Sequence, residues 1–199
     1  MGARLVGVSP ADGGLGVSGI VRGIGEGSVK ALYVLEDDIA QDSRFAAVLS
    51  KLELLIVHSS VANKTTESAD IVLSSSTYAE KHGTFTNFQG RVQRITPAVA
   101  TLESDRARDG FSMSRWDKFA SANDRWGRPL RKDARPTWRI LTAVANAMGT
   151  KLKYLSSEDV FREMAERIPG FKGLNYSKLG TAGVKLNMPE KIAAAVEVL

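Results

Sequence analysis

The chain has 199 residues, of which 43% are hydrophobic and 25% charged, with a formal net charge of +5 and no cysteine. The missing cysteines exclude disulfides, thiolate zinc sites and cysteine-held iron–sulfur clusters within this chain. The length suits one ordinary domain with appendages, and the mild positive charge fits an acidic protein partner as well as a nucleic acid. The only two histidines, His58 and His82, are expected to be ordinary loop or strand-end residues rather than metal ligands.

The sequence has no run of roughly 18 to 20 apolar residues, the length that a membrane helix needs. Its first residues, MGARLV, lack the apolar core of a signal peptide. We therefore expect a cytoplasmic protein that is not inserted directly into a membrane. Any attachment to the inner membrane would come through partner subunits.

Residues 1–28 are rich in glycine and contain a G-x-G-x-x-G pattern at Gly14, Gly16 and Gly19. A strand at 4–8 and an acid at Glu36 or Asp37 would complete the arrangement of a nucleotide-binding module. Each glycine inside a helix costs about 1 kcal/mol relative to alanine. The helix that a nucleotide-binding fold needs here would be interrupted by three glycines, Gly23, Gly25 and Gly27. Residues 1–28 are therefore predicted to be a flexible segment instead.

Residues 29–102 are predicted to form an α/β domain with a parallel, Rossmann-like sheet flanked by helices. Apolar runs at 31–35, 54–57 and 70–73 are typical of buried strands. A helix is expected at 43–52, where Asp42 is a natural N-cap, and one polar helical turn at 63–68. Strands that alternate with helices favour parallel pairing and right-handed crossovers.

The stretch at 79–94, AEKHGTFTNFQGRVQR, follows the third predicted strand and is expected to be an extended loop at the carboxyl edge of the sheet. Open α/β sheets bind ligands and partners at that edge. Gly83 and Gly90 permit backbone geometries that a side chain forbids, and the hydroxyl and amide groups offer neutral hydrogen bonds. These groups could hold a ligand or tie the loop onto the sheet, and the residues alone leave both roles open.

Residues 103–135 carry many charges of both signs, with Trp116 and Trp126 spaced among them. Mixed charge argues against a nucleic-acid groove, and aromatic residues are common anchors of protein interfaces. We expect a charged aromatic arm that binds a partner protein, and no nucleic acid.

Residues 136–199 are predicted to form a helical carboxy-terminal region. Pro136 suits a first turn, Gly149 a helix end, and Ser156 to Asp159 a capping box. A last helix is expected at 190–198. Apolar stripes mark core or docking faces: Trp138, Leu141, Val144, Ala145 and Met148 in the first helix, and Val160, Phe161, Met164, Ala165 and Ile168 in the second. No nucleophile, base and acid set can be assembled from these residues.

Several of these segments resemble the molybdopterin oxidoreductase superfamily. The similarity runs from about residue 29 to residue 176, and it is carried by KALYVL at 30–35, LLIV at 54–57, ESADIVL at 67–73 and the A-E-K-x-G-T-F-x-N-x-x-G-R-x-Q string at 79–93. RPTWRIL at 135–141 also resembles a helix start of that family. Within the superfamily, the sequence is most similar to the carboxy-terminal part of the large iron–sulfur subunit of NADH-quinone oxidoreductase (complex I).

The chain departs from the family pattern at the turn after its first strand. Family members that hold a molybdopterin guanine dinucleotide carry a glycine and a proline there, whereas this chain has Glu36, Asp37 and Asp38. Three carboxylates repel a phosphate. The family's proline after the third strand is here Ser74, and its acid before Gly-Arg is here Gln89.

The resemblance and the missing cysteines together imply an accessory or structural fragment of that complex I-like large subunit, encoded alone, without its own redox centre or cofactor. Its partners would be other subunits of a membrane-bound oxidoreductase complex, including an iron–sulfur subunit or a separately encoded amino-terminal half. The alternative is one part of a split molybdopterin-dependent, formate dehydrogenase-like enzyme that contributes to binding pterin guanine dinucleotide. The resemblance then implies these cofactor-binding candidates: Gly83, Thr84, Asn87, Gly90, Arg91 and Gln93.

Overall fold

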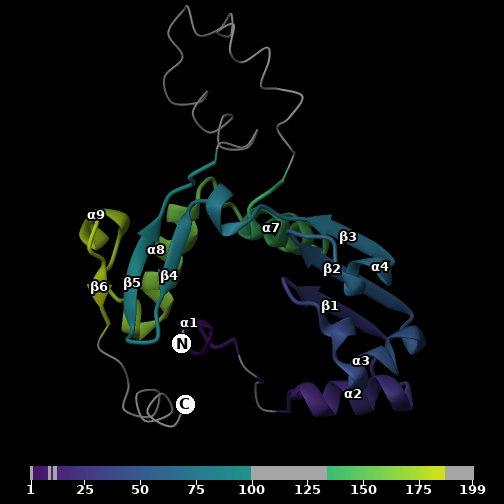
Figure 1. The fold of residues 1–199 in the computed structure, drawn as a ribbon. Coiled ribbons are helices and arrows are strands. Elements are labelled where there is room, and N and C mark those ends of the chain that lie inside the picture. Colours follow the sequence, from purple (N-terminus) through teal and green to yellow (C-terminus); the bar gives the residue numbers. More distant parts are fainter. Residues whose placement is uncertain (1, 9, 11–12, 100–133, 187–199) are drawn as a thin grey trace, which may run out of the picture. The chain divides into compact units, whose positions relative to one another are not determined.

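The computed structural model describes residues 2–8, 10, 13–99 and 134–186 (Figure 1). The predicted charged arm, except for its last two residues, and the predicted helix at 190–198 lie outside these ranges. Contacts divide the chain into two compact units. We call Ser9–Ser75 the parallel-sheet unit, and Met1–Val8 together with Ser76–Leu199 the hairpin unit. The sequence-based boundaries at 28, 102 and 135 stay predictions.

The parallel-sheet unit contains the three strands that the apolar runs predict. They are β1 (Ala31–Leu35), β2 (Leu54–Ser59) and β3 (Ile71–Ser74), in the spatial order β1-β2-β3, and both pairs are parallel. The register places Leu32 opposite Leu55 and Val34 opposite Val57. The protein therefore has the mixed α/β fold with a parallel sheet flanked by helices that the sequence indicates.

Helices cover the face of this sheet that presents the four paired leucine and valine side chains. They are α2 (Val17–Glu26), α3 (Ser43–Ala46) and the 3-10 turn η2 (Leu49–Lys51) (Figure 1). Their buried side chains meet the strands in one apolar core: Ile24, Val34, Phe45, Leu49, Leu55 and Val57. Burial of such a side chain contributes roughly 1.5 to 3 kcal/mol, so this core holds the helices on the sheet.

The two short connections between the strands begin at capped helical turns, of which the sequence predicted the cap at Asp42. The Asp42 carboxylate accepts a hydrogen bond from the Arg44 N–H at the start of α3, and Asn63 forms a capping box with Thr66 at α4 (Lys64–Glu67). The continuous helix predicted at 43–52 is wrong. Val48 has φ −124°, outside the helical region, and this break separates α3 from η2.

The glycine-rich segment before β1 is a helix, so the predicted interruption is wrong. Gly23 lies where α2 meets the next segment, and a Cβ there would stand 2.8 Å from Val29 Cγ2. Gly27 ends the helix with φ 77°, a left-handed conformation that favours glycine. Glycines raise the free energy of forming this helix. The close packing at Gly23 and the full burial of Ile24 offset that cost.

The strand that a nucleotide-binding module would need at 4–8 is absent from the described residues, because α1 (Gly2–Leu5) is a short helix. Leu5 and Val6 pack against the core of the hairpin unit and take no part in the parallel sheet. The G-x-G-x-x-G pattern therefore does not follow a strand in the described chain. A nucleotide-binding fingerprint needs that strand, so the pattern loses its structural support.

The stretch at 79–94 is a β-hairpin rather than an extended loop. After the 3-10 turn η3 (Tyr78–Glu80), β4 (Gly83–Thr86) pairs antiparallel with β5 (Arg91–Ile95). A short strand, β6 (Val184–Lys185), adds to β5 from the region that the sequence predicts to be wholly helical. The sheet order is β4-β5-β6.

Helices pack on this small sheet to form the second core. They are α8 (Ser157–Arg167) and α9 (Tyr176–Leu179), with the 3-10 turn η6 (Pro169–Phe171) between them. The buried side chains are Val92, Phe161, Ala165, Phe171, Tyr176, Leu179 and Leu186. The predicted capping box of Ser156 and Asp159 is confirmed at the start of α8.

Helix α7 (Thr137–Ala147) begins after Pro136, as predicted, but buries a different face. Ile140 is its buried side chain, whereas Leu141 is 40% and Met148 82% exposed. The predicted stripe of α7 is therefore partly exposed, since Trp138, Val144 and Ala145 are half-buried and the other two side chains are exposed. None of the helices in the described ranges is long and apolar enough to cross a membrane.

Candidate functional site

The carboxyl edge of the parallel sheet brings together the residues that follow its three strands. Glu36 follows β1, Ser60 follows β2, and Ser75 follows β3. The Glu36 Oε2 atom accepts hydrogen bonds from the Ser60 N–H at 3.2 Å and from the Ser60 hydroxyl at 2.9 Å. The Ser75 hydroxyl donates to Glu36 Oε1. One carboxylate thus joins the ends of all three strands.

Glu36 holds an unusual backbone conformation in order to reach this position. Its φ is 54°, and it is the only residue other than glycine with positive φ in the described chain. Such a conformation costs roughly 1 to 3 kcal/mol for a side chain of this kind. The Glu36 N–H donates to the His58 carbonyl at 2.7 Å, which fixes the backbone as the carboxylate bonds fix the side chain. This is the turn where the family pattern has a glycine, and the left-handed φ explains why glycine suits it.

Asp38 is committed to the neighbouring turn. Its carboxylate accepts hydrogen bonds from the Thr65 N–H at 2.9 Å, the Thr65 hydroxyl at 2.7 Å and Gln41 Nε2 at 2.6 Å. The Thr65 hydroxyl, followed by Gln41, lowers the pKa of Asp38 below its ordinary value of 3.8. Asp38 therefore ties α4 to the turn after β1 as a stable anion.

Asp37 is the carboxylate that this edge presents outward. It is exposed, and its Oδ1 atom accepts a hydrogen bond from the Asp38 N–H at 2.9 Å. Within the described ranges, no cation pairs with it and no other hydrogen bond engages it. Asp37 thus keeps acceptor capacity for a group from outside the chain.

His58 lies behind this edge, at the end of β2, as the strand-end prediction requires. It is fully buried; Tyr33 Oη lies 2.9 Å from its Nδ1 atom, and its Nε2 atom stands 3.9 Å from Glu36 Oε1. Burial raises the pKa of Tyr33. His82 precedes β4 in the other unit, and desolvation followed by the charge of Arg94 lowers its pKa. The two histidines are far apart in the sequence and lie in different units.

The six cofactor-binding candidates all fall within the β4–β5 hairpin. The Asn87 Oδ1 atom accepts hydrogen bonds from the Gln89 N–H at 3.0 Å and the Arg91 N–H at 2.9 Å, which closes the turn. Gly90 has φ 76°, as the prediction of special backbone geometry requires. Gly83 does not have positive φ, so that prediction is wrong for Gly83.

Arg91 and Gly90 also tie the hairpin to the segment around β6. Arg91 Nη1 donates to the carbonyls of Ala182 and Gly183, each at 3.2 Å, and the Gly90 carbonyl accepts from the Leu186 N–H at 2.9 Å. Asn87, Gly90 and Arg91 therefore have architectural roles. Thr84 and Gln93 make no side-chain hydrogen bond within the described part of the chain.

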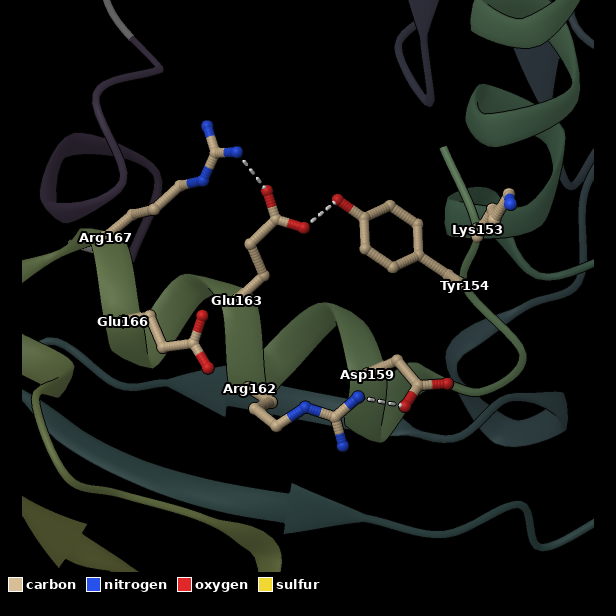
Figure 2. A pocket seen from close by; sticks show the side chains of 7 residues that line it. All are labelled: Lys153, Tyr154, Asp159, Arg162, Glu163, Glu166 and Arg167. Carbon is tan, nitrogen blue, oxygen red and sulfur yellow. Dashed lines mark hydrogen bonds and ion pairs between the residues drawn. The ribbon is translucent and has the colours of Figure 1, made fainter. Parts of the chain in front are cut away.

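Sequence reasoning missed a cavity of about 320 Å³ on α8 of the hairpin unit. Figure 2 shows the side chains that line it: Lys153, Tyr154, Asp159, Arg162, Glu163, Glu166 and Arg167. Arg162 pairs with Asp159 and Arg167 with Glu163, each at 2.6 Å, and the Tyr154 hydroxyl donates to Glu163. This hydrogen bond is the main cause of the raised pKa of Tyr154. Because arginines already neutralise two of its acids, the cavity is not a suitable acid–base site.

The described residues contain no group of three or more histidine or acidic side chains that could hold a metal ion. The resemblance implies a pterin guanine dinucleotide, and the sheet edge fits one end of that molecule better than the other. Three of its backbone donors are already used: the Glu36 N–H donates to the His58 carbonyl, the Ser75 N–H to the Ser59 carbonyl, and the Ser60 N–H to Glu36 Oε2. A phosphate needs such donors and positive charge. A guanine base, with N–H donors, and a ribose, with hydroxyls, suit the Asp37 carboxylate.

Comparison with known proteins places the chain in a family. The model of the molybdopterin oxidoreductase family matches residues 7–115, more than half of the 199 residues. The chain is 31% identical over 174 residues to the putative formate dehydrogenase YrhE of Bacillus subtilis, and the match covers 84% of this chain and 15% of that protein.

Two further relatives give the same result. The identity is 33% over 178 residues to NADPH-Fe(3+) oxidoreductase subunit alpha of Geobacter sulfurreducens, covering 87% of this chain and 17% of that one. The identity to formate dehydrogenase H of Escherichia coli is 28% over 178 residues, and the match covers 87% of this chain and 21% of that protein. The chain thus spans about a fifth or less of the length of these relatives. They support the superfamily resemblance and not the finer likeness to the large subunit of complex I. The chain belongs to the molybdopterin oxidoreductase family.

Proposed function

We propose that this chain is one part of a molybdopterin-dependent oxidoreductase of the formate dehydrogenase type, and that it contributes to binding the guanosine end of a pterin guanine dinucleotide. The family match and the formate dehydrogenases among the relatives support this proposal. They favour it over the accessory fragment of the complex I large subunit that the missing cysteines suggest.

The observation that carries the proposal is the acidic turn at the carboxyl edge of the parallel sheet. Glu36 and Asp38 hold the turn through internal hydrogen bonds, and Asp37 stays exposed beside them. A carboxylate accepts two hydrogen bonds from the N1–H and amino group of guanine, whereas adenine has no N1–H to donate. Asp37 would therefore orient the guanosine end, and the bound dinucleotide would supply the metal-centred redox chemistry.

Five of the six hairpin candidates, all but Gly83, divide into two groups under this proposal. Asn87, Gly90 and Arg91 build the hairpin and its junction with β6, as their hydrogen bonds indicate. Thr84 and Gln93 are the candidates for contact with the cofactor, because their side-chain groups are not used within the described chain.

The rest of the enzyme would come from outside this chain. Two relatives are named as alpha subunits, and the chain matches only a small share of their length. Since this sequence has no cysteine, iron–sulfur clusters would lie on other polypeptides or segments. A place at the inner membrane would follow only if those partners are membrane-bound.

The test is to isolate the tagged chain with its natural partners and measure pterin, guanine nucleotide, molybdenum and tungsten in the purified assembly. We expect pterin and one of the two metals in stoichiometric amounts with the wild type. Asp37→Asn should lower the bound guanine nucleotide. Glu53→Gln is the matched control, because Glu53 is an exposed carboxylate just before β2, at the opposite edge of the sheet. A purified assembly that contains no pterin, no molybdenum and no tungsten would contradict the proposal.

A further inference from the structure

The small sheet of the hairpin unit has helices on one of its faces. Side chains alternate between the two faces of a sheet, and directly opposite residues of antiparallel strands share a face. Val92 is fully buried in one core with Phe161 of α8 and Tyr176 of α9, so these helices cover the face that Val92 presents (Figure 1). The residues next to Val92 in β5 therefore lie on the opposite face, together with their cross-strand partners. We call it the outer face and define it by Phe85, Arg91, Gln93, Ile95 and Lys185.

Two cations stand directly opposite each other on the outer face. The register places Arg91 of β5 opposite Lys185 of β6, and like charges in this arrangement lower the stability of a sheet. Arg91 Nη1 donates to the carbonyls of Ala182 and Gly183, which are neutral acceptors and leave the positive charge in place. Lys185 is exposed, and no acid among the described residues forms an ion pair with it. The fold thus maintains an uncompensated pair of cations at its surface.

The sequence that builds this sheet contains cations and no acids. Residues 81–99 and 168–186 include no aspartate or glutamate, and their lysines and arginines are Lys81, Arg91, Arg94, Lys172, Lys178 and Lys185. Helix α8 does carry acids, but it packs on the covered face, and its Asp159 and Glu163 already pair with arginines of the same helix. The outer face therefore offers its positive charge to an acidic group that these segments do not contain.

Exposed aromatic side chains accompany the cations. Phe85 on the outer face is 51% exposed, and Phe88 in the hairpin turn is 71% exposed. Exposure alone does not distinguish this face, because Ile71 of β3 is 45% exposed. The uncompensated charge does distinguish it: Lys30, which precedes β1 in the parallel sheet, pairs with Glu53 at 2.7 Å. The outer face thus combines apolar surface with positive charge that the described chain leaves unpaired.

We propose that the outer face docks a partner protein that presents carboxylates to Arg91 and Lys185 and an apolar side chain to Phe85. Aromatic and arginine side chains are typical anchors of protein interfaces, and complementary charge gives such an interface its specificity. A nucleic-acid strand needs cations along its whole path, whereas the two cations of this face stand together beside the hairpin turn. The docking goes beyond the proposed function and does not depend on whether the chain contacts a cofactor.

Zero-length cross-linking tests the contact in the assembly purified through a tag on this chain. A carbodiimide joins a lysine amine to a carboxylate only where the two groups are in contact. We expect it to join Lys185 to an aspartate or glutamate of a second polypeptide, which identifies the partner. We expect no such product from Lys151, an exposed lysine on the loop that leads to α8.

Variants of the chain separate docking from folding. Lys185→Glu should raise the urea midpoint of the isolated chain, because it replaces a like-charge pair by an ion pair with Arg91. The purified partner should nevertheless bind this variant at least about tenfold more weakly in calorimetry, because the new charge repels its carboxylates. Phe85→Ser should also weaken binding. Lys151→Glu and Leu155→Ser are the matched controls and should leave binding unchanged, since Leu155 is 91% exposed on the same loop as Lys151.

Several results would overturn the docking proposal. Lys185 may form no cross-link, or cross-links only to carboxylates of this chain or of a second copy; either result excludes a separate acidic partner. Equal binding of the partner by Lys185→Glu and Lys151→Glu would exclude a contact based on charge. Amide shifts at Arg91 and Lys185 with a single-stranded oligothymidylate, and none with the partner, would assign the face to a nucleic acid. A pterin-containing assembly without the Lys185 cross-link would overturn the docking alone, and a cross-linked assembly without pterin would count against the proposed function alone.

Discussion

The Ser60 hydroxyl donates a hydrogen bond to Glu36 Oε2 at 2.9 Å and so joins the ends of β1 and β2. Glu36 makes this contact from a left-handed backbone conformation, with φ 54°. The strain in this residue and the hydrogen bonds it makes act in opposite directions on stability. Substitutions at this position can separate the two effects.

Glu36→Ala should destabilise the parallel-sheet unit by about 1 kcal/mol more than Glu36→Gly. Both changes remove the carboxylate, but alanine keeps the cost of positive φ whereas glycine does not. Urea unfolding of the two variants measures the difference. Equal stability, or a more stable alanine variant, would show that the left-handed conformation is not maintained in solution.

Thr65→Val should raise the pKa of Asp38 towards 3.8, because it removes the hydroxyl that lowers this pKa most. The folded-state pKa of Asp38 lies below the unfolded value, so the ionised carboxylate stabilises the fold above about pH 4 and this contribution is lost as the pH falls through the folded pKa. An NMR titration of the Asp38 carboxyl carbon measures the midpoint. Gln41→Ala should produce a smaller rise. An unchanged midpoint in Thr65→Val would contradict the hydrogen bond.

Gly183→Ala should destabilise the hairpin unit by roughly 2 to 4 kcal/mol. Gly183 has φ 73°, and a Cβ there would lie 2.3 Å from the Val92 carbonyl oxygen. Gly170→Ala is the control, because no atom lies within 4 Å of its added Cβ and its φ is not in the left-handed region. Hydrogen exchange at β5 reports the loss. Similar exchange rates in both variants would rule out the close approach of β6 to β5.

Asn87→Ala should destabilise the hairpin by about 1 to 2 kcal/mol, because the N–H groups of Gln89 and Arg91 lose their acceptor. Gln89→Ala should change stability by less than about 0.5 kcal/mol, since its side chain makes no hydrogen bond in the described chain. Thermal unfolding of the two variants shows whether Asn87 stabilises the turn or serves a ligand. If Asn87 served a ligand instead of the turn, its loss would leave stability unchanged.

Local sequence signals predicted the parts of the fold that depend on neighbouring residues. The apolar runs identified β1, β2 and β3, the polar caps identified the starts of α3 and α8, and the polar turn predicted at 63–68 contains α4. These features depend on side-chain periodicity and on hydrogen bonds within one turn, which a sequence displays directly.

Features that depend on tertiary contact were missed. Helix α2 contains glycines yet packs Ile24, fully buried, into the core of the parallel-sheet unit, a contact that glycine propensity does not report. β6 pairs with Arg91 and Val92 from more than ninety positions later in the chain. The hairpin does have a local signal, because Asn87 and Gly90 lie at the two ends of a turn between segments of alternating polarity. The same residues belong to the family motif, which suggests ligand binding instead.

The candidate site was predicted in part. The sequence identified the acidic turn at 36–38 as hostile to phosphate, and in the structure the N–H groups of Glu36 and Asp38 already donate to the His58 carbonyl and to Asp37 Oδ1. The sequence could not show which carboxylate stays exposed, because that depends on how Thr65 and Ser60 fold back onto Asp38 and Glu36.

The most direct test of the account is an NMR titration of the isotopically labelled chain with guanosine, adenosine and inorganic pyrophosphate. We predict that guanosine shifts the amide resonances of residues 36–38, that Asp37→Asn abolishes the shifts, and that Glu53→Gln keeps them. Adenosine and pyrophosphate should leave these resonances in place. Shifts at 36–38 that are as large with pyrophosphate as with guanosine would contradict the central claim that this acidic edge receives the nucleoside and excludes the phosphates.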